Sequence, residues 1–287
     1  MRNIIKKLLL FGITGLLLLA SFGCGGGESN GSSSATNTSG YVIPNIAVDP
    51  ATYTFRANTL IEETTYVWNL LQKYQWYQAN GYTISLPNHV VVKNLINKSL
   101  NNTPFTNSDL TDLQNAMLGI YSSNDYQLGL NKLNESKEQI LSCFPAFLDY
   151  KAKWLTRGWN FKVFSNYTVR LTLYGPGGSY NSNTGETIMI TCPDGKFARG
   201  TDPAPTVVHE TTHIAIEDAV IIKFSVTQQV KERIVDKFCY YHFRRVLPDY
   251  EMQSKGDVSI DPYLDQPDSW ERLPYYIGRF SSGLPPN

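Results

Sequence analysis

The 287-residue sequence is short of the features that mark several common functional classes. Its charges balance, with 25 Lys and Arg against 25 Asp and Glu, and it has no basic patch or stripe of the kind that binds nucleic acid. Its four cysteines stand singly and have none of the spacing of a zinc knuckle. Histidine is also scarce, with four in the chain. Two of these four, however, stand four residues apart in one short stretch.

Long apolar runs are almost absent, and the one that occurs is too short and too soon broken by glycine to be a good membrane span. It covers residues 8–20, follows three basic residues and precedes Gly23 and Cys24. This order is typical of a secretory signal, so we expect residues 1–23 to be removed on export. Cys24 after Gly23 resembles the bacterial lipoprotein box. That resemblance implies a lipid anchor at Cys24 in the cell envelope, with plain secretion as the alternative.

The segment that follows is rich in Gly, Ser and Asn, and we expect residues 24–40 to form a flexible tether. Without the signal, 22 basic residues would face 25 acidic ones, a net charge of −3. The rest is long enough for one large domain or for two lobes that share a cleft. We expect a helical N-terminal lobe over 41–158 and a second part with strands and helices over 159–287.

Helical spacing of apolar residues dominates the first of these parts. It predicts a helix over 54–77 and another over 109–121. A third helix is expected over 135–155, where Pro145 predicts a kink.

After this region the spacing of apolar residues changes from helical to alternating. Alternating apolar residues predict strands over 169–174 and 187–191, with a possible short strand over 161–164. A helix is expected to follow Pro203 and Pro205, and another to cover 225–244. The tail from Asp257 is rich in Pro, Asp and Tyr, so we expect it to be irregular.

The two close histidines belong to the motif His209-Glu210-Thr211-Thr212-His213. On a helix, residues four apart lie about 40° apart around the axis and about 6 Å along it. Both imidazoles can therefore face one zinc ion, with Glu210 beside an activated water as general base. The alternative is a buried helix whose histidines are merely satisfied by hydrogen bonds. Glu217 continues the same face but would lie about 12 Å along the axis from His209, too far to share one ion easily.

Eighteen residues separate His213 from Glu232. This pattern, H-E-x-x-H followed after eighteen residues by Glu, resembles the gluzincin zinc metallopeptidases, and the spacing is that of their aminopeptidase branch. Lys231 stands where that branch has an asparagine. The resemblance implies that His209, His213 and Glu232 hold one Zn²⁺ per chain. It also implies that Asp236, one turn after Glu232, orients a zinc-bound histidine. The alternative for Glu232 and Asp236 is an exposed charged face.

By the same resemblance, residues 159–287 would be a zincin-like catalytic domain of the α+β class, and the substrate a peptide or protein. Residues 188–191 would be the edge strand to which an extended peptide could add. A donor to the oxyanion would also be needed, and the candidates are Tyr263, ranked first, with Tyr275, Tyr276 and His242. Two other readings remain open: hydrolysis of another carbonyl substrate, and a non-catalytic, surface-tethered binding or scaffold protein on a zincin fold.

The remaining cysteines are Cys143, Cys192 and Cys239. In an oxidising compartment one pair of them could form a disulfide and leave one free. The alternative is that they are buried as small hydrophobic residues.

Overall fold

The computed structural model describes residues 52–79, 81–198, 200, 202–253 and 256–286. Cys24, the expected signal peptide and the expected tether lie outside the described residues. Within the described part, no helix combines the length and the apolar character needed to cross a membrane.

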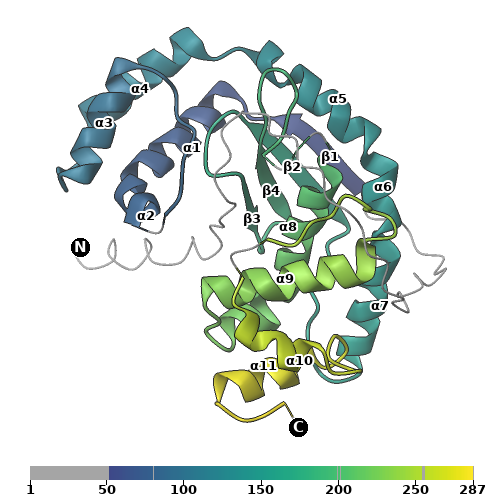
Figure 1. The fold of residues 1–287 in the computed structure, drawn as a ribbon. Coiled ribbons are helices and arrows are strands. Elements are labelled where there is room, and N and C mark those ends of the chain that lie inside the picture. Colours follow the sequence, from purple (N-terminus) through teal and green to yellow (C-terminus); the bar gives the residue numbers. More distant parts are fainter. Residues whose placement is uncertain (1–51, 80, 199, 201, 254–255, 287) are drawn as a thin grey trace, which may run out of the picture.

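The described chain is a mixture of helices and one small sheet (Figure 1). The sheet has four strands in the order β1-β2-β4-β3. The first three in this order are parallel neighbours, and β3 runs antiparallel to β4. The expectation of mixed α and β structure is therefore confirmed. The strands are β1 (Thr52–Ala57), β2 (Asn166–Thr172), β3 (Gly178–Asn181) and β4 (Glu186–Ile190).

Helices lie between β1 and β2 and again after β4. In chain order they are α1 (Leu60–Gln72), α2 (Tyr74–Ala79), α3 (Val90–Leu100), α4 (Asn107–Ile120), η2 (Ser123–Tyr126), α5 (Gln127–Glu135), α6 (Lys137–Ser142), α7 (Phe144–Leu155), α8 (Ala204–Ile216), η3 (Glu217–Ile222), α9 (Gln228–Phe243), η4 (Val258–Ile260), α10 (Asp261–Leu264) and α11 (Leu273–Ser281).

The N-terminal part contributes a strand to the sheet, which the sequence analysis missed. Where one helix was expected over 54–77, the chain forms β1 and then the helices α1 and α2. Strand β1 pairs in parallel with β2, and Tyr53 lies opposite Tyr167. The region expected as a helical lobe is thus built into the same sheet as the region that follows it.

Three clusters of buried hydrophobic residues hold the described part of the chain together, and the smallest contains Tyr66, Leu70 and Tyr77. The main core joins residues of the sheet to α7, α8 and α9, and it includes Tyr53, Phe147, Val169 and Phe238. A second, smaller core lies between α1, α3 and α4. Helix α8 contacts β3 and β4, so the helix that carries the histidine motif is packed between the sheet and α9.

A buried carboxylate ties α1 to the sheet. Glu63 has no exposed surface, and its oxygens accept hydrogen bonds from the side chains of Asn58 (2.6 Å), Tyr126 (2.8 Å) and Thr172 (2.8 Å). A fourth comes from the backbone N–H of Leu173 (2.9 Å). These donors lie before α1, in η2, at the end of β2 and just after it, so one side chain fixes how those segments meet.

Three further expectations need correction. Residues 188–191 do not form the edge of the sheet, because β4 lies between β2 and β3, and the edge strands are β1 and β3. The tail is not irregular, since η4, α10 and α11 lie within it. Residues 161–164 form no strand.

The proline in the third expected helix also acts differently. In place of a kink there is a break at Cys143, and Pro145 stands in the first turn of α7, where its missing N–H costs no hydrogen bond.

Candidate metal centre

Helix α8 carries the histidine motif through the middle of the protein. Every residue from Ala204 to Ile216 is buried, as expected for a helix that is apolar on most sides. Pro205 stands in its first turn, and the Asp202 carboxylate accepts a hydrogen bond from the Ala204 N–H at 2.9 Å. His209 and His213 have no exposed surface and therefore meet their partners inside the protein.

Helix α9 lies against α8 and supplies the acidic partners. The Thr227 side chain caps its N-terminus by accepting from the Val230 N–H. Glu232 and Asp236 are one turn apart and both are buried. The alternative of an exposed charged face is therefore wrong for these two residues, although their neighbours Arg233 and Lys237 form ion pairs with acidic residues of the tail.

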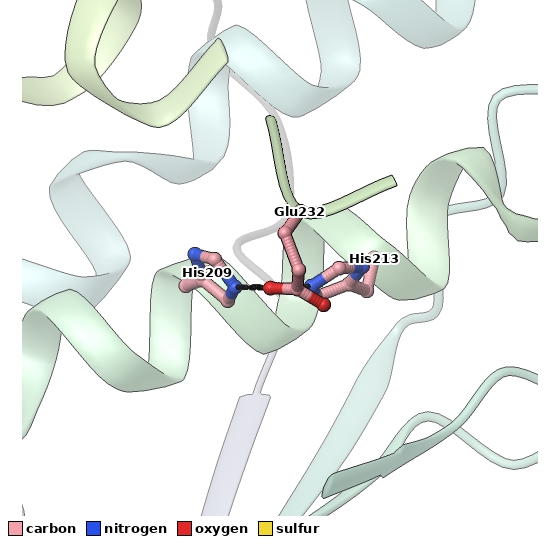
Figure 2. Close-up of side chains that lie close together, drawn as sticks. All are labelled: His209, His213 and Glu232. Carbon is pink, nitrogen blue, oxygen red and sulfur yellow. Dashed lines mark hydrogen bonds and ion pairs between the residues drawn. The ribbon is translucent and has the colours of Figure 1, made fainter. Parts of the chain in front are cut away.

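The side chains of His209, His213 and Glu232 converge between the two helices (Figure 2). The two Nε2 atoms lie 3.0 Å apart. The Oε2 atom of Glu232 lies 3.3 Å from Nε2 of His209 and 3.6 Å from Nε2 of His213. Ligands about 2.0–2.2 Å from a tetrahedral zinc ion would be separated by about 3.4 Å, so this triangle of N, N and O atoms has the size of a zinc site. The cluster could hold a metal ion.

The Glu232 carboxylate is fixed by two amide side chains. Gln228 donates to its Oε1 atom at 2.7 Å, and Gln253 donates to its Oε2 atom at 3.1 Å. Burial alone would raise the pKa of the Glu232 carboxyl, but the neighbouring histidines outweigh it and hold that pKa well below its ordinary value. The Glu232 carboxyl is therefore ionised at neutral pH.

His209 is oriented from behind by a short relay. Its Nδ1 atom lies 2.8 Å from the Tyr250 hydroxyl, which donates to Oδ1 of Asp236 at 2.9 Å. Because the hydroxyl gives its proton to Asp236, it accepts from Nδ1–H of His209, which leaves the Nε2 lone pair free for a metal. Asp236 itself lies 3.3 Å from Nδ1 and also accepts from the Gln253 N–H at 2.7 Å.

His213 is held differently. Burial lowers the pKa of its imidazole to about 3, so the ring is neutral at physiological pH. Its Nδ1 atom is buried and has no hydrogen-bond partner among the residues that the structure describes. The ring of Tyr180, from strand β3, stacks against the imidazole with centroids 4.9 Å apart and planes 6° apart.

Glu210 follows His209 on α8 and has no exposed surface. Its charge contributes, after burial, to the raised pKa values of Tyr66 and Tyr180. The expected general base is thus a buried side chain, close enough to Tyr66 and Tyr180 for its charge to affect their pKa values.

The candidates for the oxyanion donor do not join this cluster. The Tyr263 hydroxyl donates to the Leu284 carbonyl at 2.6 Å, and the Tyr276 hydroxyl donates to Asp268. The ring of Tyr275 packs against that of Tyr276, and aromatic rings surround His242. Another tyrosine, Tyr82, which the sequence analysis did not consider, has a pKa raised to about 12 by burial and then by the negative charge of Glu232. The rings around His242 are those of Tyr150, Phe238, Tyr241, Phe243 and Trp270.

Two of the cysteines are free thiols inside the protein. Cys143 and Cys239 are both fully buried and unbridged. Burial raises the pKa of the Cys143 thiol, and the Cys239 sulfur lies 3.3 Å from the Thr212 hydroxyl. For these two, burial as small hydrophobic residues is confirmed.

Of the residues that the sequence pointed to, the structure brings together His209, His213, Glu232 and Asp236, with Glu210 next to them on α8. It adds Tyr250, Gln253, Gln228 and Tyr180, for which no local motif exists. Comparison of the chain with protein-family models, with curated proteins and with solved structures gave no match to any of them.

Proposed function

We propose that this protein is a zinc-dependent peptidase of the gluzincin kind, with His209, His213 and Glu232 as the metal ligands. The observation that carries the proposal is the triangle of Nε2, Nε2 and Oε2 atoms, with sides of 3.0, 3.3 and 3.6 Å, between two packed helices. A merely satisfied pair of histidines would not need a third, ionised donor at the same distance.

The donor set supports catalysis more than a structural site. Among the described residues, the group that could hold a metal contains three ligands. A structural zinc site is closed by four protein ligands, whereas a catalytic one keeps a position for water or substrate. A zinc ion bound here would supply a Lewis acid that polarises a carbonyl and lowers the pKa of a water molecule.

The residues of the chain would then divide the remaining work. Glu210 would accept a proton from the attacking water and pass it to the leaving amine. Tyr82, whose pKa is raised by burial and then by the charge of Glu232, is one candidate to donate a hydrogen bond to the developing oxyanion. Strand β3 is one of the two edge strands of the sheet, and its Tyr180 stacks on His213, a proposed ligand. An extended peptide that paired with β3 would therefore run beside the metal centre.

The cellular setting is part of the same proposal. The apolar run before Cys24 and the Gly/Ser/Asn-rich tether support export and a lipid anchor at the bacterial cell envelope. Radiolabelled fatty acid incorporated by the intact chain and lost in Cys24→Ala would support the anchor, while equal release of both proteins into the medium would favour plain secretion.

Zinc content and peptide cleavage, measured on wild type beside Glu210→Gln, test the function. We expect about one zinc per chain in both proteins, and cleavage of a mixed peptide library by the wild type alone. Zinc in both with cleavage by neither would leave a metal-holding binding or scaffold protein. Equal cleavage by both would remove Glu210 from the mechanism.

A further inference from the structure

The two histidines of the centre are oriented by different means. The Nδ1 atom of His209 has a hydrogen-bonded partner in Tyr250. The Nδ1 atom of His213 is buried without one. A metal-bound histidine almost always gives its second N–H to an acceptor, which fixes the plane of the ring. Something else must fix the plane of His213.

Tyr180 is in the position to do so. Its ring lies nearly parallel to the His213 imidazole, with 6° between the planes and 4.9 Å between the centroids. By comparison, the rings of His209 and Tyr250 are 6.4 Å apart and inclined by 25°. A stacked ring limits the rotation of the imidazole about its Cβ–Cγ bond, because this rotation would turn the imidazole plane into the face of the tyrosine ring.

Tyr180 is itself held at its other end. Its hydroxyl donates to Oε2 of Glu217 at 2.5 Å, and the Lys231 ammonium donates to the same hydroxyl at 3.3 Å. The ammonium also lies 5.5 Å from the centre of the tyrosine ring. All three side chains are buried, with exposures of 6% for Tyr180, 3% for Glu217 and 6% for Lys231. The buried negative and positive charges offset one another through the phenol that separates them.

A local change in helix type accompanies this arrangement. Helix α8 ends at Ile216, and the π-helical turn η3 begins at Glu217. Such turns are rare, are wider than an α-helix and occur often at functional sites. The irregular turn thus starts at the residue that anchors the tyrosine.

We propose that Tyr180, locked by Glu217 and Lys231, is a positioning residue that sets the plane of His213 for metal binding by ring stacking. The stack replaces the hydrogen bond that His213 lacks at Nδ1. The proposal rests on the zinc centre proposed above, and it predicts that the ring of Tyr180 matters more than its hydroxyl.

The first measurement reads the stack without any metal. In the metal-free full chain, the ring protons of His213 lie over the face of Tyr180, so their NMR signals are expected upfield of those of His209. Tyr180→Phe should keep that shift, and Tyr180→Leu should abolish it. A wild-type His213 signal without the upfield shift would overturn the proposal, whatever the metal does.

The second measurement is zinc affinity, determined by competition with a chromophoric chelator. Loss of an outer partner of a ligand typically weakens metal binding about 10–100-fold. We expect a loss of this size in Tyr180→Leu and an affinity close to wild type in Tyr180→Phe. Wild-type affinity in Tyr180→Leu, or an equal loss in both variants, would overturn the positioning role of the ring.

A matched control separates positioning from general damage to the core. Tyr167 is also buried and stacked, on Tyr53 with centroids 5.1 Å apart and planes 14° apart, and its hydroxyl accepts from the Phe164 N–H. Tyr167→Leu should lower the free energy of unfolding but leave zinc affinity unchanged. If Tyr167→Leu lowers zinc affinity as much as Tyr180→Leu does, the effect reflects general damage to the core and the proposal fails. If the wild type binds zinc but cleaves no peptide, the peptidase function is excluded and this inference stands. If the wild type binds no zinc, both are overturned.

Discussion

The Nε2 atoms of His209 and His213 face each other at 3.0 Å in a part of the core with no exposed surface. Two imidazoles this close cannot both be protonated without strong repulsion, and burial lowers the pKa of His213 to about 3. The His213 ring is therefore neutral at physiological pH, which is the form that binds a metal. The ionised carboxylate of Glu232 completes the donor set.

The identity of the third ligand gives the first prediction. Glu232→Ala removes the only carboxylate of the described cluster, so zinc affinity should fall by more than the roughly 10–100-fold lost with an outer partner. Glu62→Ala is the control, because the Glu62 carboxylate pairs with Arg56 and supplies no ligand atom to the cluster. Metal content of both purified proteins, measured by mass spectrometry after dialysis, decides the matter. Equal zinc contents in the two variants would remove Glu232 from the ligand set.

The relay behind His209 gives the second prediction. Tyr250→Phe removes the hydroxyl that joins Nδ1 of His209 to Asp236 and should weaken zinc binding up to about 10–100-fold. Tyr263→Phe also removes a tyrosine hydroxyl, but one that bonds to the Leu284 carbonyl, and should leave affinity unchanged. Chelator competition at neutral pH measures both. Equal affinities for the two variants would show that Asp236 orients His209 without the tyrosine.

The metal ligands could be predicted because their geometry is local. His209 and His213 share one helix face by their spacing alone, and Glu232 with Asp236 repeat that geometry on the next helix. The residues that hold these ligands could not be predicted. Tyr250, Gln253 and Tyr180 reach the site only because the chain folds back past α9 or across the sheet, and no sequence motif marks them.

The errors in the fold have physical causes. Strand β1 carries alternating Tyr53, Phe55 and Ala57, but it runs almost directly into α1, so the helical period of the longer segment obscured it. Strand β3 has the sequence Gly-Ser-Tyr-Asn, which is more typical of a turn than of a strand. In the tail, Pro262 and Pro274 stand in the first turns of α10 and α11, where proline is favoured, so they begin helices rather than break them.

The buried Glu63 gives the third prediction, on stability. Glu63→Gln replaces an acceptor of four hydrogen bonds with a group that must present its own donors to some of the same partners. A buried donor left without its acceptor typically costs about 1–3 kcal/mol, so a loss of at least that size is expected. Glu62→Gln, at the neighbouring and partly exposed position, breaks the ion pair with Arg56 and should cost about 1 kcal/mol or less. Urea unfolding of the two variants compares the costs, and similar values would mean that Glu63 contributes no more than a surface pair.

The buried His242 gives the last prediction, on pH dependence. Burial, and to a smaller degree the charge of Lys153, lowers the pKa of its imidazole to about 3, against an ordinary value near 6.5. Between these two pH values the unfolded chain binds a proton at this position that the folded chain does not. The free energy of unfolding therefore falls as the pH falls through this range, by up to about 1.4 kcal/mol per pH unit.

His242→Phe keeps a ring among the surrounding aromatic side chains and removes the titrating group. Urea unfolding of the metal-free protein at about pH 7 and about pH 5 should then show a loss of stability toward acid that is smaller than in wild type by up to about 2 kcal/mol. The variant should still lose some stability toward acid, because burial also lowers the pKa of His213 and no zinc is bound to this histidine. Equal slopes for variant and wild type would mean that His242 takes up a proton in the folded protein near its ordinary pKa. The aromatic rings around His242 would then have to admit water at a pH well above about 3, the pKa that burial gives this imidazole.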